Sequence, residues 1–111
     1  MKKLTIKSWA PDDRPREKLE SKGKASLSDA ELIAIIIGSG NRQESALALS
    51  QRMLQSVNGN LYQLAKLSIE KLTTFKGVGV AKAIAIITAL ELGKRRQLET
   101  IQKKGTITSS K

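Results

Sequence analysis

The sequence contains neither cysteine nor histidine among its 111 residues. Without cysteine the chain can form no disulfide bond and no thiolate metal site. Without histidine it lacks the commonest general base and the commonest zinc and copper ligand. Catalysis by a Ser-His-Asp or a Cys-His set within this chain is therefore excluded, and we expect a non-enzymatic chain that binds no cofactor of its own.

Aromatic residues and long apolar runs are scarce as well. Trp9, Tyr62 and Phe75 are the only aromatic residues, so the core must be aliphatic and recognition of single strands by base stacking has little support. The start of the chain has no apolar run of signal-peptide length, and the stretch 80–92 is too short and too polar to cross a bilayer. We therefore expect a cytoplasmic protein without a membrane partner.

The chain is strongly basic. Lys and Arg number 20 against 10 Asp and Glu, which gives a net charge of +10, and the excess is spread along the whole chain. This charge favours a polyanionic partner, for which nucleic acid is the default; the alternative is a soluble protein that merely happens to be basic.

Helix signals follow one another along the chain, and no region shows the sustained alternation of a strand. We therefore predict an all-α fold of five to six short helices, arranged as a tandem helix-hairpin-helix-like bundle. The expected elements are a short helix that starts after Asp12 or Asp13 and ends at Gly23, a helix over 29–37, and further helices over about 43–57, 61–67, 69–74 and 80–96. Ser28 and Glu31 have the spacing of a capping box, and Ser68 is a further N-cap candidate.

The most informative segment is 72–83, LTTFKGVGVAKA, in which two glycines flank one apolar residue between two helices. Glycine allows a positive φ or a close backbone approach, and Val78 can point inward and fix the turn to the core. The next helix then begins with unpaired N–H groups, which together with the helix dipole attract anions. The pattern resembles the helix-hairpin-helix motif, whose family use is sequence-independent contact with the DNA phosphate backbone; the usual proline before the first glycine is replaced by Lys76.

The predicted DNA-binding residues are Lys76, Gly77, Val78, Gly79, Val80, Ala81 and Lys82. Lys76 and Lys82 add positive charge beside the amides, and we expect Lys82→Glu to weaken binding while sparing the fold. The alternative interpretation is a plain corner between two helices, in which the glycines serve geometry only.

A weaker copy of this pattern lies 39 residues upstream, where Gly38-Ser39-Gly40 separates two expected helices. The residues of this second candidate hairpin are Gly38, Ser39, Gly40, Asn41 and Arg42. Paired hairpins are able to contact both strands of a duplex, but Ser39 is polar where Val78 is apolar, so a purely structural role is the alternative. A nucleotide-binding loop is excluded, because Asn41 follows where that motif needs lysine and no strand precedes it.

Two further patterns concern the long helix and the aspartates. The Lys94-Arg95-Arg96 run is placed to complement the dipole at the end of the long helix. A DNA glycosylase of the helix-hairpin-helix class has a catalytic aspartate after the hairpin, whereas every aspartate here, Asp12, Asp13 and Asp29, precedes it.

The order of segments resembles the N-terminal region of the RadC (UPF0758) family, historically labelled DNA repair proteins. The matching stretches are DRPREKL at 13–19, LSDAELIAI at 27–35, FKGVGVAKA at 75–83 and LELGKR at 90–95. The resemblance implies a further, C-terminal domain with a JAB/MPN-like metalloprotease fold, whose His-x-His…Asp site holds zinc. Since this chain has no histidine, we interpret it as an N-terminal fragment with an arm and short helix over 1–26, a helix-hairpin-helix domain over 27–97, and a linker toward the absent domain over 98–111.

Two functions are therefore expected from the sequence. The first is a non-enzymatic module that binds DNA, duplex or branched, without sequence preference. The second is a protein-interaction or dimerisation module that positions a metal-dependent hydrolase domain, with a homodimer formed through the apolar helix 80–92.

Overall fold

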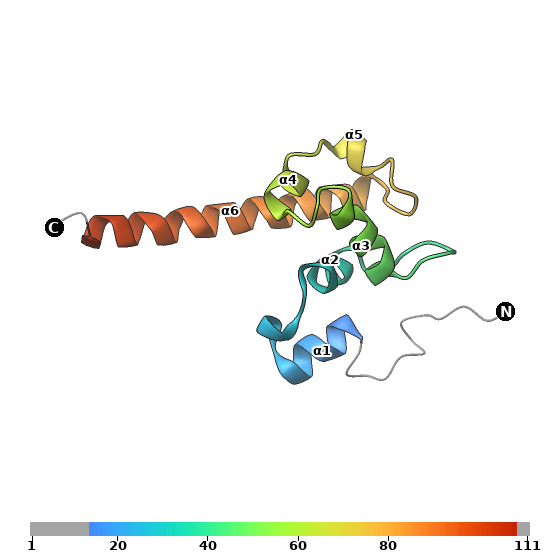
Figure 1. Cartoon of the computed structure of the whole chain (residues 1–111), viewed down its shortest axis with the longest axis horizontal. Coiled ribbons are helices and arrows are strands. Elements are labelled where there is room, and N and C mark those ends of the chain that lie inside the picture. Colours follow the sequence, from blue (N-terminus) through green and yellow to red (C-terminus); the bar gives the residue numbers. More distant parts are fainter. Residues whose placement is uncertain (1–13, 109–111) are drawn as a thin grey trace.

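A computed structural model describes residues 14–108 of the chain, with side-chain surroundings through Gln102 (Figure 1). Within this range the fold contains six α-helices and one 3-10 turn and no strand, so the predicted all-α class is confirmed. The elements are α1 (Pro15–Lys22), η3 (Lys24–Ser26), α2 (Asp29–Ile37), α3 (Ala46–Gln55), α4 (Leu61–Ala65), α5 (Ile69–Leu72) and α6 (Val80–Thr108). Trp9, Asp12 and Asp13 lie outside the described residues, and the N-cap of α1 is Arg14 rather than either aspartate.

Four helices begin with a polar side chain that accepts a hydrogen bond from a backbone N–H of the first turn. These caps are Ser28, Ser45, Asn60 and Ser68. Both halves of the predicted capping box are present, since the Glu31 N–H donates to the Ser28 hydroxyl at 3.1 Å and the Ser28 N–H donates to the Glu31 carboxylate at 2.7 Å. Short polar segments thus fix where these helices start.

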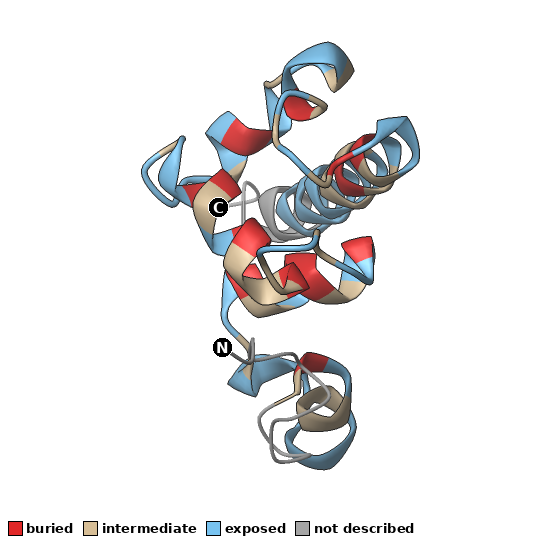
Figure 2. Ribbon diagram, turned by 90° about the vertical axis from the view of Figure 1, so that its right-hand side faces the viewer, coloured by how far each residue is buried: buried red, intermediate tan, exposed pale blue. Residues whose placement is uncertain are grey.

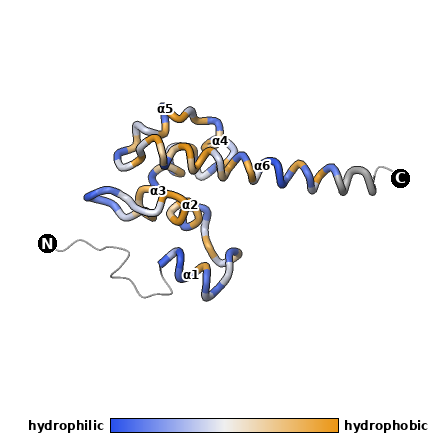
Figure 3. The backbone as a smooth tube through the Cα atoms, turned by 180° about the vertical axis from the view of Figure 1, so that it is seen from behind, coloured by the Kyte–Doolittle hydropathy of each residue, from blue (hydrophilic) through white to orange (hydrophobic). Residues whose placement is uncertain are grey.

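The core is aliphatic, as expected, and is formed by α2, α3, α4, α5 and the first turns of α6. Figure 2 shows its buried residues in red. Its largest fully buried apolar side chains are Leu49, Met53, Leu64, Leu72 and Ile86. Figure 3 shows the same division as hydropathy, with apolar stretches on the packed helices and polar residues on the loops and along the outer part of α6.

The boundaries of two predicted helices are wrong. The helix expected from about residue 43 begins at Ala46, because the Asn41 side-chain oxygen accepts hydrogen bonds from the N–H groups of Gln43 and Glu44, both at 2.8 Å, and holds them in a turn. The helix expected to reach residue 74 ends at Leu72, where 3-10-type bonds take over.

The long helix was predicted to end near Arg96 and to give way to an irregular linker from Leu98, whereas α6 continues through Thr108. The segment 97–104, QLETIQKK, is rich in good helix formers, which explains the continuation in spite of its lost apolar periodicity. Every residue from 91 to 102 is exposed, so this part of α6 projects away from the body (Figure 1). Lys94-Arg95-Arg96 therefore lies within the helix and not at its end.

Candidate nucleic-acid interface

The second loop, residues 73–79, joins α5 to α6 and contains the Gly77-Val78-Gly79 turn. Val78 is 4% exposed and its N–H donates to the Phe75 carbonyl at 2.9 Å, so its side chain fixes the turn to the core as predicted. Gly77 has φ +97°, and a Cβ there would lie 3.1 Å from Asn41 and 3.2 Å from Leu49. This position requires glycine both for its backbone conformation and for its close packing.

Gly79 is a different case, because a Cβ at this position would meet no atom within 4 Å and its φ is not in the left-handed region. The fold itself therefore does not demand glycine here. Its carbonyl accepts the first hydrogen bond of α6, from Ala83 at 3.0 Å, so Gly79 occupies the cap position of that helix without any side chain to act as a cap.

The N–H groups of Gly79, Val80, Ala81 and Lys82 donate to no acceptor among residues 14–108. Gly79, Val80 and Ala81 are exposed, with Val80 58% accessible. The four helices with polar caps each satisfy a first-turn amide internally, whereas the longest helix leaves its amides open to solvent. A helix start of this kind presents several donors and the positive end of the dipole to an anion.

The two lysines of the predicted site differ. Lys76 is exposed on the second loop and free to approach a phosphate. The Lys82 ammonium instead donates to the Ser39 carbonyl at 2.8 Å, the Ser39 hydroxyl at 3.0 Å and the Gly77 carbonyl at 3.1 Å. Lys82→Glu would place a carboxylate against two carbonyls, so these contacts argue against the expectation that this substitution spares the fold.

The first loop, residues 38–45, joins α2 to α3 and contains the other pair of glycines. Gly38 has φ +78°, matching the positive φ of Gly77, and a Cβ on Gly40 would lie 2.6 Å from the Ser45 carbonyl carbon. Ser39 is exposed where Val78 is buried, and the Ser45 hydroxyl caps α3. The first loop thus resembles the second in its leading glycine but not in its inward residue or its helix start.

The two loops lie side by side at the end of the molecule opposite the free end of α6 (Figure 1). The Asn41 amide donates to the Lys76 carbonyl at 2.9 Å, and Lys82 bridges Ser39 and Gly77. The candidate hairpins of the sequence are therefore brought together, and Arg42 and Lys76 are exposed on the same pair of loops.

A bidentate ion pair joins the first loop to α3. Arg52 of α3 donates to both carboxylate oxygens of Glu44, at 2.9 and 2.8 Å, and lies 5.6 Å from the centre of the Phe75 ring. The hydrogen bonds from Arg52, followed by that from Asn41, lower the pKa of Glu44 below its ordinary value. Glu44, a carboxylate of the first loop, is thus ionised, and Arg52 balances its charge. Sequence reasoning missed this pair, because its members are eight positions apart and Glu44 precedes α3, so the spacing rules for pairs within one helix do not connect them.

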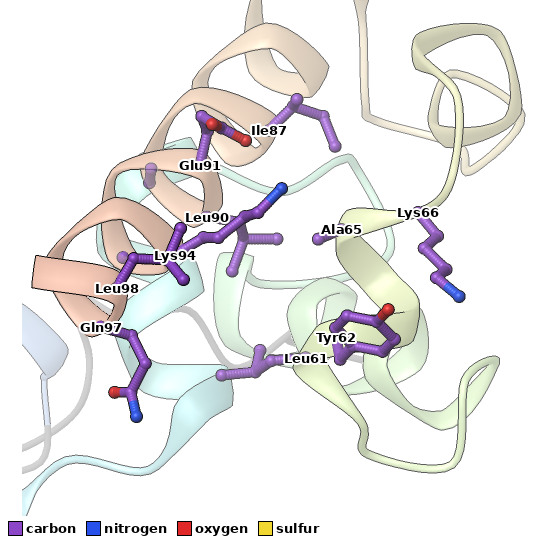
Figure 4. A pocket seen from close by; sticks show the side chains of 12 residues that line it. Leu61, Tyr62, Ala65, Lys66, Ile87, Leu90, Glu91, Lys94, Gln97 and Leu98 are labelled. Atoms are coloured by element: carbon purple, nitrogen blue, oxygen red, sulfur yellow. The ribbon is translucent and has the colours of Figure 1, made fainter. Parts of the chain in front are cut away.

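A groove of about 580 Å³ lies between α4 and α6, away from the loops (Figure 4). Leu90 of α6 and Ala65 of α4 point toward one another across it, and Leu61 and Leu98 extend its apolar lining. Lys66 and Lys94 stand at its rim, Lys66 with its ammonium 4.6 Å from the centre of the Tyr62 ring.

Two negative findings concern the part of the chain from 14 to 108. Its acidic side chains form no group of three or more that is able to hold a metal ion. None of its helices combines the length and the apolar character needed to cross a membrane.

Comparison with known proteins gives a consistent result. The UPF0758 N-terminal family model matches residues 6–84. A UPF0758 protein of Flavobacterium johnsoniae is 60% identical over 108 residues, which cover 97% of this chain and 47% of the relative. UPF0758 proteins of Porphyromonas gingivalis (42% identical, 97% of this chain and 48% of the relative) and Trichlorobacter lovleyi (44%, 93% and 47%) are similar. The chain spans about half the length of these relatives, and no solved structure matches it.

Proposed function

Because the chain belongs to the UPF0758 family and contains its N-terminal domain, we propose that it is a non-enzymatic module that binds the phosphate backbone of DNA without sequence preference. Its main contacts are the open amides of Gly79, Val80 and Ala81, assisted by the exposed Lys76 and Arg42. Lys82 is not among the proposed phosphate contacts, because its three protons are already used.

One observation carries this proposal: the longest helix starts at exposed residues whose N–H groups have no acceptor within the described chain. Buried or internally capped amides would not be available to a ligand. The net charge of +10 favours a polyanionic ligand, and the ion pair with Arg52 balances the negative charge of Glu44 on the first loop. Since the donors belong to the main chain, they recognise phosphate oxygens and carry no base information.

Proline at position 80 tests the role of the amides directly. Proline is tolerated at the first position of a helix, and Val80 is exposed, so Val80→Pro removes one N–H without breaking an internal bond. We expect duplex affinity to fall roughly tenfold, as for the loss of one hydrogen bond to a charged group. Val80→Ala, which keeps the N–H, is the matched control, and equal affinity of the two variants in a fluorescence anisotropy titration would reject the proposal.

Salt dependence tests the same proposal at the level of the whole interface. If about four phosphates are neutralised, the logarithm of the association constant falls against the logarithm of salt concentration with a slope of roughly −3 to −4. A flat response contradicts backbone binding.

The groove between α4 and α6 favours a second candidate function, protein interaction or dimerisation. Leu90 and Leu98 form part of an apolar strip that leaves the body with α6, where Leu98 is 48% and Ile101 52% exposed. Sedimentation distinguishes the two candidates: a tight dimer that ignores DNA, and that Leu98→Glu dissociates, favours this second function.

For the longer relatives we propose that the half beyond the matched domain is a zinc-dependent, JAB/MPN-like hydrolase acting in the cytoplasm, in keeping with the family's DNA repair label. The described residues of this chain do not supply that zinc site, because no histidine or cysteine exists in the chain and its described carboxylates do not cluster.

A further inference from the structure

We infer that Lys82 is a positioning residue: it holds the first and second loops at a fixed spacing, so that one duplex meets both loops as a single surface. This inference rests on the function proposed above and assigns to Lys82 a role other than phosphate contact.

The hydrogen bonds of Lys82 carry the inference. An ammonium group has three protons, and here each has an acceptor: the Ser39 carbonyl, the Ser39 hydroxyl and the Gly77 carbonyl, at 2.8, 3.0 and 3.1 Å. The acceptors come from two loops whose leading glycines are 39 residues apart in the sequence. A lysine that merely attracted phosphate would extend into solvent, whereas this side chain is partly buried between the loops.

A second hydrogen-bonded contact between the loops, which together with that of Lys82 we call a tie, fixes their spacing at another point. The Asn41 amide donates to the Lys76 carbonyl at 2.9 Å and to the Glu44 carboxylate at 3.0 Å. Asn41 also lies so close to Gly77 that a Cβ there would be 3.1 Å away. Two ties and one close packing contact leave the loops little freedom to move relative to one another.

The joined surface suits a polyanion with regularly spaced charges. Arg42 on the first loop and Lys76 on the second are both exposed, and the nearby Glu44 is paired with Arg52. Loops that are already fixed lose less conformational entropy on binding than loops that must order separately. Lys82 therefore contributes to affinity by making the Arg42 contact available together with the contacts of the second loop.

A double-mutant cycle on duplex binding tests the inference. We would titrate wild type, Arg42→Ala, Lys82→Met and the double variant against a short duplex at several salt concentrations. We expect Arg42→Ala to reduce affinity by at least about threefold in the wild-type background and by less than about twofold in the Lys82→Met background. The salt slope of the double variant should be about one unit shallower than that of wild type, since only Arg42 is a phosphate contact.

Additive effects, with a slope about two units shallower in the double variant, identify Lys82 as a direct phosphate ligand and overturn the inference. Unchanged binding by Lys82→Met overturns it as well. Ser39→Ala, which removes one acceptor and keeps the carbonyl, is the matched control and should bind within about twofold of wild type. If Lys82→Met does not fold, Lys82→Gln, which retains a donor, takes its place in the same cycle.

Amide hydrogen exchange without DNA separates this inference from the proposed function. The N–H groups of Gln43, Glu44 and Val78 are bonded within the loops and should exchange faster in Lys82→Met, with the core amides of α3 unchanged. If the loop amides exchange faster in Lys82→Met but the wild-type chain binds no duplex, then Lys82 does hold the loops together and only the proposed function is rejected. Unchanged loop exchange rejects the tie itself.

Discussion

At the scale of single residues, the glycines of the two loops do different things. Gly40 is enclosed by the backbone of Glu44 and Ser45, and Gly77 has a positive φ against Asn41. Gly79 has open space around its α-carbon and serves no steric need of the fold. The missing side chain at position 79 therefore leaves the start of α6 uncovered, which is the property that the proposed function uses.

The first prediction contrasts two of these glycines. Gly40→Ala should lower the free energy of unfolding by about 1–3 kcal/mol, because its Cβ overlaps neighbouring backbone. Gly79→Ser should raise it by a few tenths of a kcal/mol, because serine caps the helix slightly better than glycine. Urea unfolding followed by circular dichroism measures both values. Equal effects of the two substitutions would contradict the contrast drawn between these positions.

The second prediction concerns acid stability. The pKa of Glu44 is lowered in the folded chain, first by Arg52 and then by Asn41, so the folded state favours the ionised carboxylate. Its contribution to stability is present above its ordinary pKa of 4.5 and is lost as pH falls through the lower folded pKa. Glu44→Gln should therefore reduce stability at pH 7 and flatten the loss below about pH 4.5.

Thermal unfolding at a series of pH values measures this effect. Glu70→Gln, which changes an exposed carboxylate of α5, is the matched control for the loss of one negative charge. A steep acid loss that persists in Glu44→Gln would contradict the assignment.

At the scale of elements, α6 combines two different parts. Its first turns bury Ala83 and Ile86 in the core, while its residues from 91 to 102 are all exposed. A helix that extends so far beyond its packing contacts depends on local propensity and on side-chain pairs such as Arg95 with Glu91, at 3.0 Å.

The third prediction follows from this division. A chain ending at Leu98 should keep a melting temperature within about 3 °C of the full chain, because residues 99–102, the removed residues whose side-chain surroundings the structure describes, are all exposed. Its helical circular dichroism signal per molecule should fall, because about ten helical residues are lost. An unchanged helical signal would show that the segment beyond Leu98 is irregular, as its sequence pattern suggested.

At the scale of the whole molecule, two groups of exposed cations lie well apart. Arg42 and Lys76 lie on the loops, whereas Lys94 and Arg96 lie on the projecting part of α6, roughly 20 Å along the helix from its start. This separation exceeds the screening length of about 8 Å at physiological salt. The two groups therefore act independently on a short ligand.

The fourth prediction compares these two groups. Arg42→Ala with Lys76→Ala should reduce affinity for a short duplex by at least about tenfold. Lys94→Ala with Arg96→Ala removes the same charge and should cost less than about threefold. Anisotropy titrations at one salt concentration measure the affinity of both double variants. A larger loss of affinity from the α6 pair would show that DNA binds α6 and not the loops.

Local sequence signals predicted much of this fold, and contacts between distant residues account for what they missed. Ser28 with Glu31, Ser68 and Gly38 act within a few residues of themselves, so helix starts and ends were readable from spacing. The tie from Asn41 to Lys76 joins residues 35 positions apart, and that from Lys82 to Ser39 joins residues 43 apart. No spacing rule connects such residues. The sequence therefore predicted the two glycine turns but not the contacts that join them, and it predicted Lys82 as a phosphate ligand and not as a link between the loops.

The length of α6 has a mechanical consequence. Its 29 residues at 1.5 Å each make a rod of about 43 Å, which begins at the loops and ends at the opposite tip of the molecule. That length equals about thirteen base-pair steps of B-form DNA at 3.4 Å. Under the proposed function, a domain joined to the far end of α6 would be held more than one full turn of the double helix away from the phosphates bound at the start of this helix.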